Sequence, residues 1–268
     1  MRSSLIALTA TLAAGAAQAA DLPPMTAPTS VVAPMVDWTG FYAGGFVGAA
    51  RTDGEAELTD VQGPLLTLDV NNGLFPREID DEDIGFYGGA MVGYDYQVGQ
   101  GVFGARATLG YLDLEADPSL SLIDPGPIFP GVTTNSSYET EFDYLATLEA
   151  TAGVAFGRLK VFAAGGLAFA DVENSVTIGV PNTVPGVATF PYGPTTFENS
   201  DTLFGYTVGG GIAYQATEAL VVSLDVMHFD LSDQSVRAID PPAFGQQYLD
   251  YEFENDGQFA RLGVAYRF

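Results

Sequence analysis

Eight segments of this chain alternate apolar side chains with small or polar ones, and the connections between them are by turns long and short. Such an alternation is typical of β-strands, because successive side chains point to opposite faces. The clearest segment is the last, Gln258–Phe268. Its apolar face comprises Ala260, Leu262, Val264, Tyr266 and Phe268, and the opposite face carries Arg261 and Arg267. Alternation alone permits two facings, since a soluble sheet buries its apolar face and a membrane barrel turns it to lipid.

The spacing of the eight segments favours the membrane barrel. The expected strands are Trp38–Gly48, Ile84–Gln97, Val102–Glu115, Thr140–Phe156, Leu159–Glu173, Asp201–Gln215, Ala219–Leu231 and Gln258–Phe268. The long connections are Arg51–Asp83, Ala116–Glu139, Asn174–Ser200 and Ser232–Asp256. A tilted membrane strand needs roughly 9–11 residues, and an even number of strands with short turns on one side is the outer-membrane plan. We predict an all-β fold, an eight-stranded antiparallel transmembrane β-barrel with four long acidic extracellular loops.

The amino terminus reads as a secretory signal. Arg2 supplies the charge, Leu5–Ala17 the apolar stretch, and Ala17-Gln18-Ala19 the cleavage site. The prediction is a signal peptide at 1–19, a proline-rich periplasmic leader at 20–36 and the barrel at 37–268. After the signal no run of roughly 18 apolar residues could form a membrane helix.

Composition narrows the function. The chain has no cysteine, which excludes disulfides and thiolate chemistry, and we expect no cofactor. A net charge of −25 with only 9 Lys+Arg argues against nucleic acid as a partner, because phosphate binding needs clustered cations.

Charged residues on the faces predicted to line the lumen form a candidate network: Asp95, Arg106, Glu149, Lys160, Asp225, Arg261 and Arg267. Buried ions are tolerable only when paired, and an eight-stranded barrel has room for side chains and little else. We therefore expect a packed polar interior. An ion-conducting path is the alternative.

The run Asp37-Trp38-Thr39-Gly40-Phe41-Tyr42-Ala43-Gly44-Gly45, after an Ala-Asp-Leu-Pro-Pro leader, resembles the small alphaproteobacterial outer-membrane β-barrel proteins, the porin-like or opacity-like surface antigens. The carboxyl-terminal segment is similar to the signal by which the outer-membrane assembly machinery takes up barrels. The resemblance implies a location in the outer membrane. It also implies an assembly role for Leu262, Val264, Tyr266 and Phe268.

The sequence contains two further candidate sites. His228, the one histidine, lies near acids and Ser232, but four residues along a strand span roughly 13 Å, too far for a catalytic hydrogen bond. We expect an interfacial histidine and no enzyme. The run Asp80, Asp81, Glu82 and Asp83 could bind a divalent cation that bridges to lipopolysaccharide phosphates, although it lacks EF-hand spacing. A solvated acidic loop is the simpler interpretation.

The sequence thus predicts an outer-membrane barrel with a structural or surface-interaction role and a lumen filled by side chains. Its expected partners are outer-membrane lipid, lipopolysaccharide and the assembly machinery. The alternative is a narrow cation-preferring porin, favoured by the acidic mouth, and a lipid-modifying enzyme is the remote one.

Overall fold

The structure is a computed structural model that describes residues 36–123, 133–179, 194–239 and 247–268. The predicted signal peptide and almost all of the predicted leader lie outside these residues. From Val36 onward the chain forms one compact unit.

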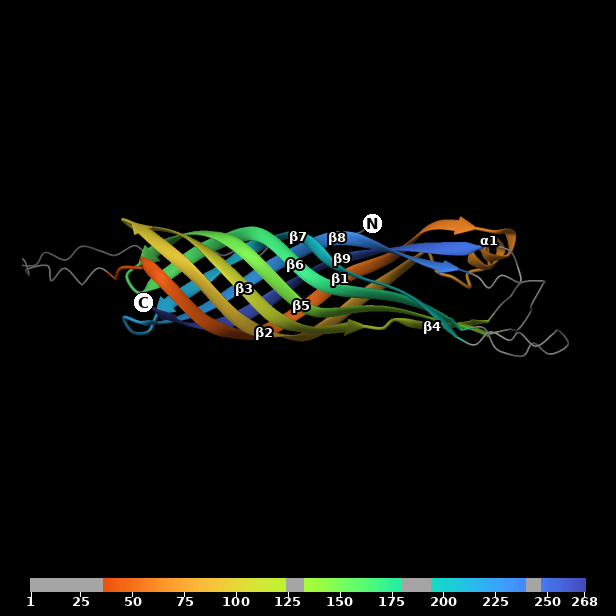
Figure 1. Cartoon of the computed structure of the whole chain (residues 1–268), viewed down its shortest axis with the longest axis horizontal. Coiled ribbons are helices and arrows are strands. Elements are labelled where there is room, and N and C mark those ends of the chain that lie inside the picture. Colours follow the sequence, from red (N-terminus) through yellow and green to blue (C-terminus); the bar gives the residue numbers. More distant parts are fainter. Residues whose placement is uncertain (1–35, 124–132, 180–193, 240–246) are drawn as a thin grey trace, which may run out of the picture. The chain divides into compact units, whose positions relative to one another are not determined.

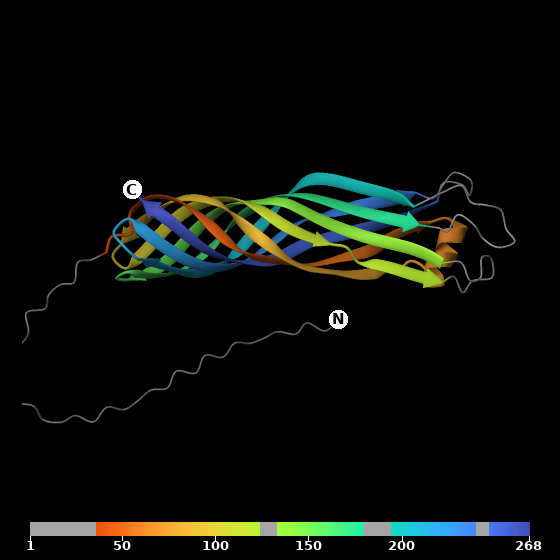
Figure 2. The ribbon, with the colours of Figure 1, turned by 90° about the horizontal axis from the view of Figure 1, so that it is seen from below.

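Eight strands close into a ring (Figures 1 and 2). The described elements are β1 (Gly40–Gln62), α1 (Pro64–Asn71), β2 (Glu78–Val98), β3 (Gly101–Ala116), β4 (Ser119–Ile123), β5 (Thr133–Phe156), β6 (Leu159–Gly179), β7 (Thr195–Gln215), β8 (Leu220–Ile239) and β9 (Tyr248–Arg267). All pairings are antiparallel, β1 pairs with β9, and β3 pairs with β5 to complete the circle. The short β4 is a ninth strand, and within the described residues it pairs with β5 alone. The predicted eight-stranded barrel is therefore confirmed.

In the half of the barrel next to the short connections, the apolar side chains point outward. On β9, Leu262, Val264 and Tyr266 are about half exposed, whereas Arg261 and Arg267 are buried. The facing of β1, which the sequence left open, is now fixed: Phe41 and Val47 point outward, and Phe46 points into the barrel. So large an exposed apolar belt fits lipid, not water.

Every strand of the ring except β3 is 20–24 residues long, and β3 has 16. The prediction of long loops was therefore wrong in part, because much of each long connection is strand. Along β9 the odd-numbered side chains point inward throughout, but the inward ones are apolar in this part of the strand and the outward ones are acidic. Glu252 and Glu254 face outward, and Tyr251 and Phe253 are buried. Acidic outward residues resemble a loop in sequence, but here they form the water-facing side of a strand.

Two seams open beyond the apolar belt. Pairing of β2 with β3 stops at Phe86 and Asp113, and pairing of β7 with β8 stops at Gly205 and Leu231. All other pairings of the ring continue toward the far end. The ring thus continues as two sheets, β2-β1-β9-β8 and β4-β5-β6-β7, which face each other as a sandwich at the end where α1 lies (Figure 1).

The sandwich has its own apolar core. Buried side chains of both sheets, of α1 and of the segment between α1 and β2 form it: Ala56, Leu58, Leu66, Val70, Leu74, Phe75, Ile79, Tyr138, Val176, Val236, Ala238, Leu249, Tyr251 and Phe253. The Tyr138 hydroxyl donates to the Tyr251 hydroxyl at 3.0 Å, and the Tyr251 hydroxyl donates to the Pro76 carbonyl at 3.1 Å. Because these polar groups are paired, the core buries them without a large desolvation penalty.

This core predicts different effects of leucine truncation at the two ends. Leu249→Ala removes a fully buried side chain of the sandwich and should lower its stability by about 2–5 kcal/mol. Leu224→Ala, on the exposed belt of β8, is the matched control and should cost far less. Limited proteolysis of the refolded protein in lipid vesicles measures the difference. Equal cleavage of the two variants would contradict a separate sandwich core.

Candidate functional site: the filled lumen

The lumen of the belt is crossed by four buried charges from opposite walls. Arg106 on β3 and Glu149 on β5 are register partners, as are Asp225 on β8 and Arg261 on β9. These two strand pairs stand opposite each other in the ring of eight. Cross-strand partners on one wall therefore meet those on the other, and the four charges form a closed quartet.

The quartet is electrically neutral and fully interlocked. Arg106 Nη2 lies 2.5 Å from Glu149 Oε2 and 3.1 Å from Asp225 Oδ2. Arg261 Nε donates to Asp225 Oδ2 at 2.7 Å, and Arg261 Nη2 lies 2.9 Å from Glu149 Oε1. The Thr147 hydroxyl donates to Glu149 Oε1 at 2.7 Å. All four charged side chains are at most 4% exposed, so each depends on its partners for the hydration it has lost.

Side chains fill the lumen on the sandwich side of the quartet. An aromatic layer packs there, with ring centroids 4.9 Å apart for Phe46 and Tyr87 and for Tyr87 and Phe259. A layer of amides follows, in which Asn174 Nδ2 donates to Gln234 Oε1 at 2.6 Å. The apolar core of the sandwich closes the far end.

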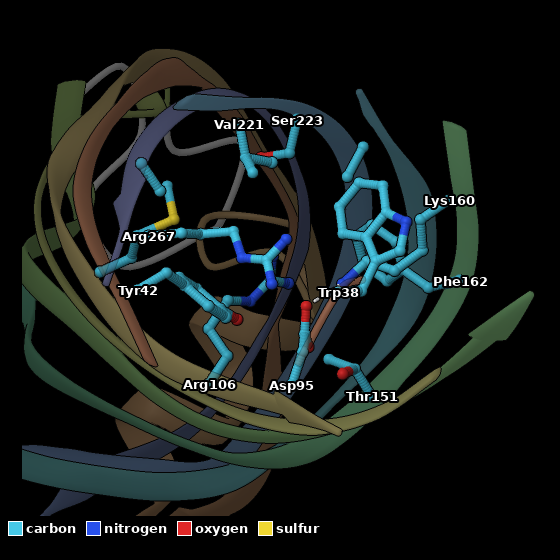
Figure 3. A pocket seen from close by; sticks show the side chains of 13 residues that line it. Trp38, Tyr42, Asp95, Arg106, Thr151, Lys160, Phe162, Val221, Ser223 and Arg267 are labelled. Carbon is cyan, nitrogen blue, oxygen red and sulfur yellow. Dashed lines mark hydrogen bonds and ion pairs between the residues drawn. The ribbon is translucent and has the colours of Figure 1, made fainter. Parts of the chain in front are cut away.

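Trp38 closes the end next to the short turns. Its backbone N–H donates to Gln97 Oε1 at 2.7 Å, and its indole N–H donates to the Gly157 carbonyl at 3.1 Å. The indole is 1% exposed and lies in the lumen beside Lys160 and Arg267 (Figure 3). The sequence predicted that Trp38 begins the first strand and gave no role for its side chain, because the facing of that strand could not be derived. The structure shows that this tryptophan is a plug.

The remaining predicted lumen charges lie beside this plug. Lys160 Nζ contacts Asp95 Oδ2 at 2.5 Å, a pair between β6 and β2 that spans the lumen. Arg267 donates through Nη2 to the Thr39 carbonyl at 2.9 Å. All seven residues named from the sequence are thus buried inside the barrel, as two networks and one separate arginine.

The other predicted sites are not assembled in this way. Asp80, Asp81, Glu82 and Asp83 belong to strand β2, whereas the sequence placed them in a loop. Among the residues that the structure describes, no group of three or more acidic or histidine side chains is placed to hold a metal.

His228 lies on the outer face of β8. Its ring packs edge-on against Tyr206, with centroids 6.3 Å apart. Ser232, the nearby serine, falls in the register shift between Leu231 and Gln234. Leu262, Val264, Tyr266 and Phe268, the residues of the proposed assembly signal, are all exposed on the belt.

Comparison with known proteins decides the family. The profile for the outer membrane protein beta-barrel domain matches residues 6–268. The chain belongs to this family. It is therefore a protein of the Gram-negative outer membrane, and in such barrels the short turns lie on the periplasmic side. The sandwich end is accordingly the extracellular end.

Relatives agree with this assignment. The chain is 25% identical over 273 residues to a 31 kDa outer-membrane immunogenic protein of Brucella melitensis, covering 100% of both chains. It is 24% identical over 237 residues to a 22 kDa outer membrane protein of Rhizobium leguminosarum bv. viciae, covering 88% of this chain and 81% of that one. The alphaproteobacterial resemblance of the sequence is confirmed.

A solved structure supports the barrel itself. The outer membrane protein OprG from Pseudomonas aeruginosa superposes with a TM-score of 0.51 at 11% sequence identity, covering 87% of this chain and 97% of that one. At such low identity the likeness concerns the fold alone.

The quartet predicts that neutralising an inward acid of β5 costs far more stability than neutralising an outward acid of the same strand. Glu149→Gln leaves two buried arginines short of a countercharge and should cost about 3–5 kcal/mol of unfolding free energy. Glu141→Gln, on the outer face of the same strand, is the control: Glu141 stands opposite Glu115 and Glu173, so neutralising it should not lower stability. Urea unfolding in lipid vesicles measures both. Similar midpoints for the two variants would contradict an interlocked quartet.

Proposed function

We propose that this protein is a structural and surface-interaction barrel whose lumen does not conduct. The observation that carries the proposal is the quartet of Arg106, Glu149, Asp225 and Arg261, which joins opposite walls of the belt. Trp38 on one side and the aromatic layer on the other leave little open space along the axis. The membrane half then serves as an anchor, and the sandwich half presents a surface outside the cell.

A narrow cation-preferring porin is the second candidate. The acidic outer surface favours it, since a negative mouth concentrates cations. The lumen argues against it, because its buried charges are four cations and three carboxylates in the described residues. A cation would have to pass this excess positive charge in a region of low dielectric constant, which is costly.

Single-channel recording in planar bilayers separates the two candidates. With folded, purified protein we expect no resolved conductance steps, because the quartet would have to break before ions could pass. Insertion is verified separately by the heat-dependent shift of the folded barrel on gels. Regular ohmic steps with cation selectivity would establish the porin instead.

On the outer surface of the sandwich, acidic residues of neighbouring strands stand directly opposite one another. Glu55 stands opposite Asp80 on β2 and Glu254 on β9. Glu57 stands opposite Glu78 and Glu252 on the same strands. Cross-strand pairs of like charge are destabilising. We propose that divalent cations relieve this repulsion and link the face to lipopolysaccharide phosphates just beyond the lipid belt.

The titration of these acids gives the sign of a pH effect. Burial, followed by the charge of neighbouring carboxylates, raises the pKa of Glu55 and of Glu254. The folded state therefore binds protons more tightly than the unfolded state, and the stability that these groups contribute falls as the pH rises through their titration. At neutral pH the acidic face destabilises the sandwich.

Neutralising one acid should therefore stabilise the sandwich and weaken its response to cations. Glu55→Gln should raise the thermal midpoint at pH 7, and added calcium should raise that midpoint less than in the wild type. Glu198→Gln is the control, because Glu198 stands opposite Ser175 and not opposite an acid. Near-ultraviolet circular dichroism of the tyrosines in the core follows unfolding. An equal response of Glu55→Gln and wild type to calcium would count against the proposal.

Two further proposals complete the function. The exposed residues at the carboxyl-terminal end, Leu262, Val264, Tyr266 and Phe268, engage the assembly machinery. Deletion of Phe268 should therefore reduce the amount of the protein in the outer membrane. We also propose that the protein is not an enzyme, since His228 packs on Tyr206 and Ser232 falls in the register shift between Leu231 and Gln234. An unchanged lipid profile on His228→Ala is the expected readout.

A further inference from the structure

A small cavity lies inside the periplasmic end of the lumen, between the Trp38 plug and the quartet (Figure 3). Its volume is about 30 Å³. Since one water molecule needs roughly 10–15 Å³ measured in this way, the cavity has room for about two water-sized particles. Trp38, Tyr42, Asp95, Lys160, Ser223 and Arg267 are among the residues that line it.

The buried charges around the cavity do not balance. The quartet is neutral, and Lys160 is neutralised by Asp95 at 2.5 Å. Arg267, which is 8% exposed, is the remaining cation. Asp37, the acid that precedes Trp38, is exposed, and its carboxylate accepts from the Thr39 N–H at 2.8 Å. Asp95 is the only carboxylate among the described residues that line the cavity, and it is already paired with Lys160, so Arg267 has no carboxylate of its own. A buried cation in that position is expensive, so something should compensate Arg267.

The guanidinium also has donors to spare. Arg267 Nη2 donates to the Thr39 carbonyl, whereas Nε and Nη1 are buried and have no hydrogen-bond partner. Figure 3 shows the guanidinium reaching into the cavity, toward Asp95 and Trp38. Buried donors are almost always satisfied, and two free donors on a cation favour an anionic acceptor.

We propose that this cavity is a binding site for one small monovalent inorganic anion of halide size, held by Nε and Nη1 of Arg267. The volume admits a halide with one water and excludes phosphate or sulfate. That water donates to Asp95 Oδ1, the other buried atom of the cavity without a partner, and so separates the anion from the carboxylate. The site neutralises the charge excess of the lumen at its periplasmic end.

The only tryptophan of the chain reports on this site, because Trp38 lines the cavity. Iodide quenches indole fluorescence at contact. Folded protein in detergent is titrated with sodium iodide at constant ionic strength, using gluconate, whose anion is too large for the cavity, as the compensating salt. We expect saturable quenching that chloride reverses by competition.

The variants make the test specific. Arg267→Gln should weaken iodide binding by about tenfold or more, since it removes charge-assisted hydrogen bonds. Arg158→Gln is the matched control, because Arg158 is exposed on the periplasmic turn beside Gly157 and should leave binding unchanged. Quenching that is linear in iodide, equal in wild type and Arg267→Gln and insensitive to chloride would overturn the proposal.

Crystals of the wild-type protein soaked in sodium bromide provide a second measurement that does not depend on the folding of a variant. An anomalous peak within hydrogen-bond distance of Arg267 Nε and Nη1 is expected. A cavity that contains only water under these conditions overturns the proposal.

Discussion

The constraint on which the rest of the structure depends is that backbone N–H and C=O groups at the depth of the lipid must all be hydrogen-bonded. A strand edge at lipid depth would leave N–H and C=O groups without partners, so the ring must be closed through the apolar belt. The β2–β3 and β7–β8 pairings end at Phe86 and Gly205, close to the level at which the last outward apolar side chains, Ile84 and Phe204, give way to polar ones. Beyond that level water can hydrate an open edge. The closed barrel can therefore continue as a sandwich without an unsatisfied backbone.

The same change of surroundings explains the two interiors. In the belt the outer face is apolar, and four of the nine basic residues of the chain lie inside, where carboxylates pair with three of them. In the sandwich the outer face meets water and carries acids, while apolar side chains fill the interior. Along β9, from Leu249 to Arg267, alternate residues point inward throughout. The inward residues are apolar in the sandwich and include arginines in the belt, whereas the outward residues are acidic in the sandwich and apolar in the belt. The outer face of one continuous strand thus meets lipid in the belt and water in the sandwich.

The packed lumen is a consequence of size. Eight strands enclose a space that side chains can fill, and here they fill it in layers of different chemistry. The charged quartet costs desolvation that only complete pairing offsets, which makes it a rigid cross-brace between opposite walls. Arg267 lies outside that brace, between the quartet and the Trp38 plug. Its two free donors give the periplasmic end a chemical character that the rest of the lumen lacks.

The sequence by itself determined the barrel, the strand parity and the inward facing of Asp95, Arg106, Glu149, Lys160, Asp225, Arg261 and Arg267, because these depend only on a period of two and on what lipid excludes. The partners of these charges needed the tertiary structure. The β3–β5 and β8–β9 registers cross long connections, so no tight turn fixes Arg106 opposite Glu149 or Asp225 opposite Arg261. The extent of the strands also needed it, since an acid faces water equally well from a loop or a strand. Only the closed ring brings opposite walls together and shows Trp38 as a plug.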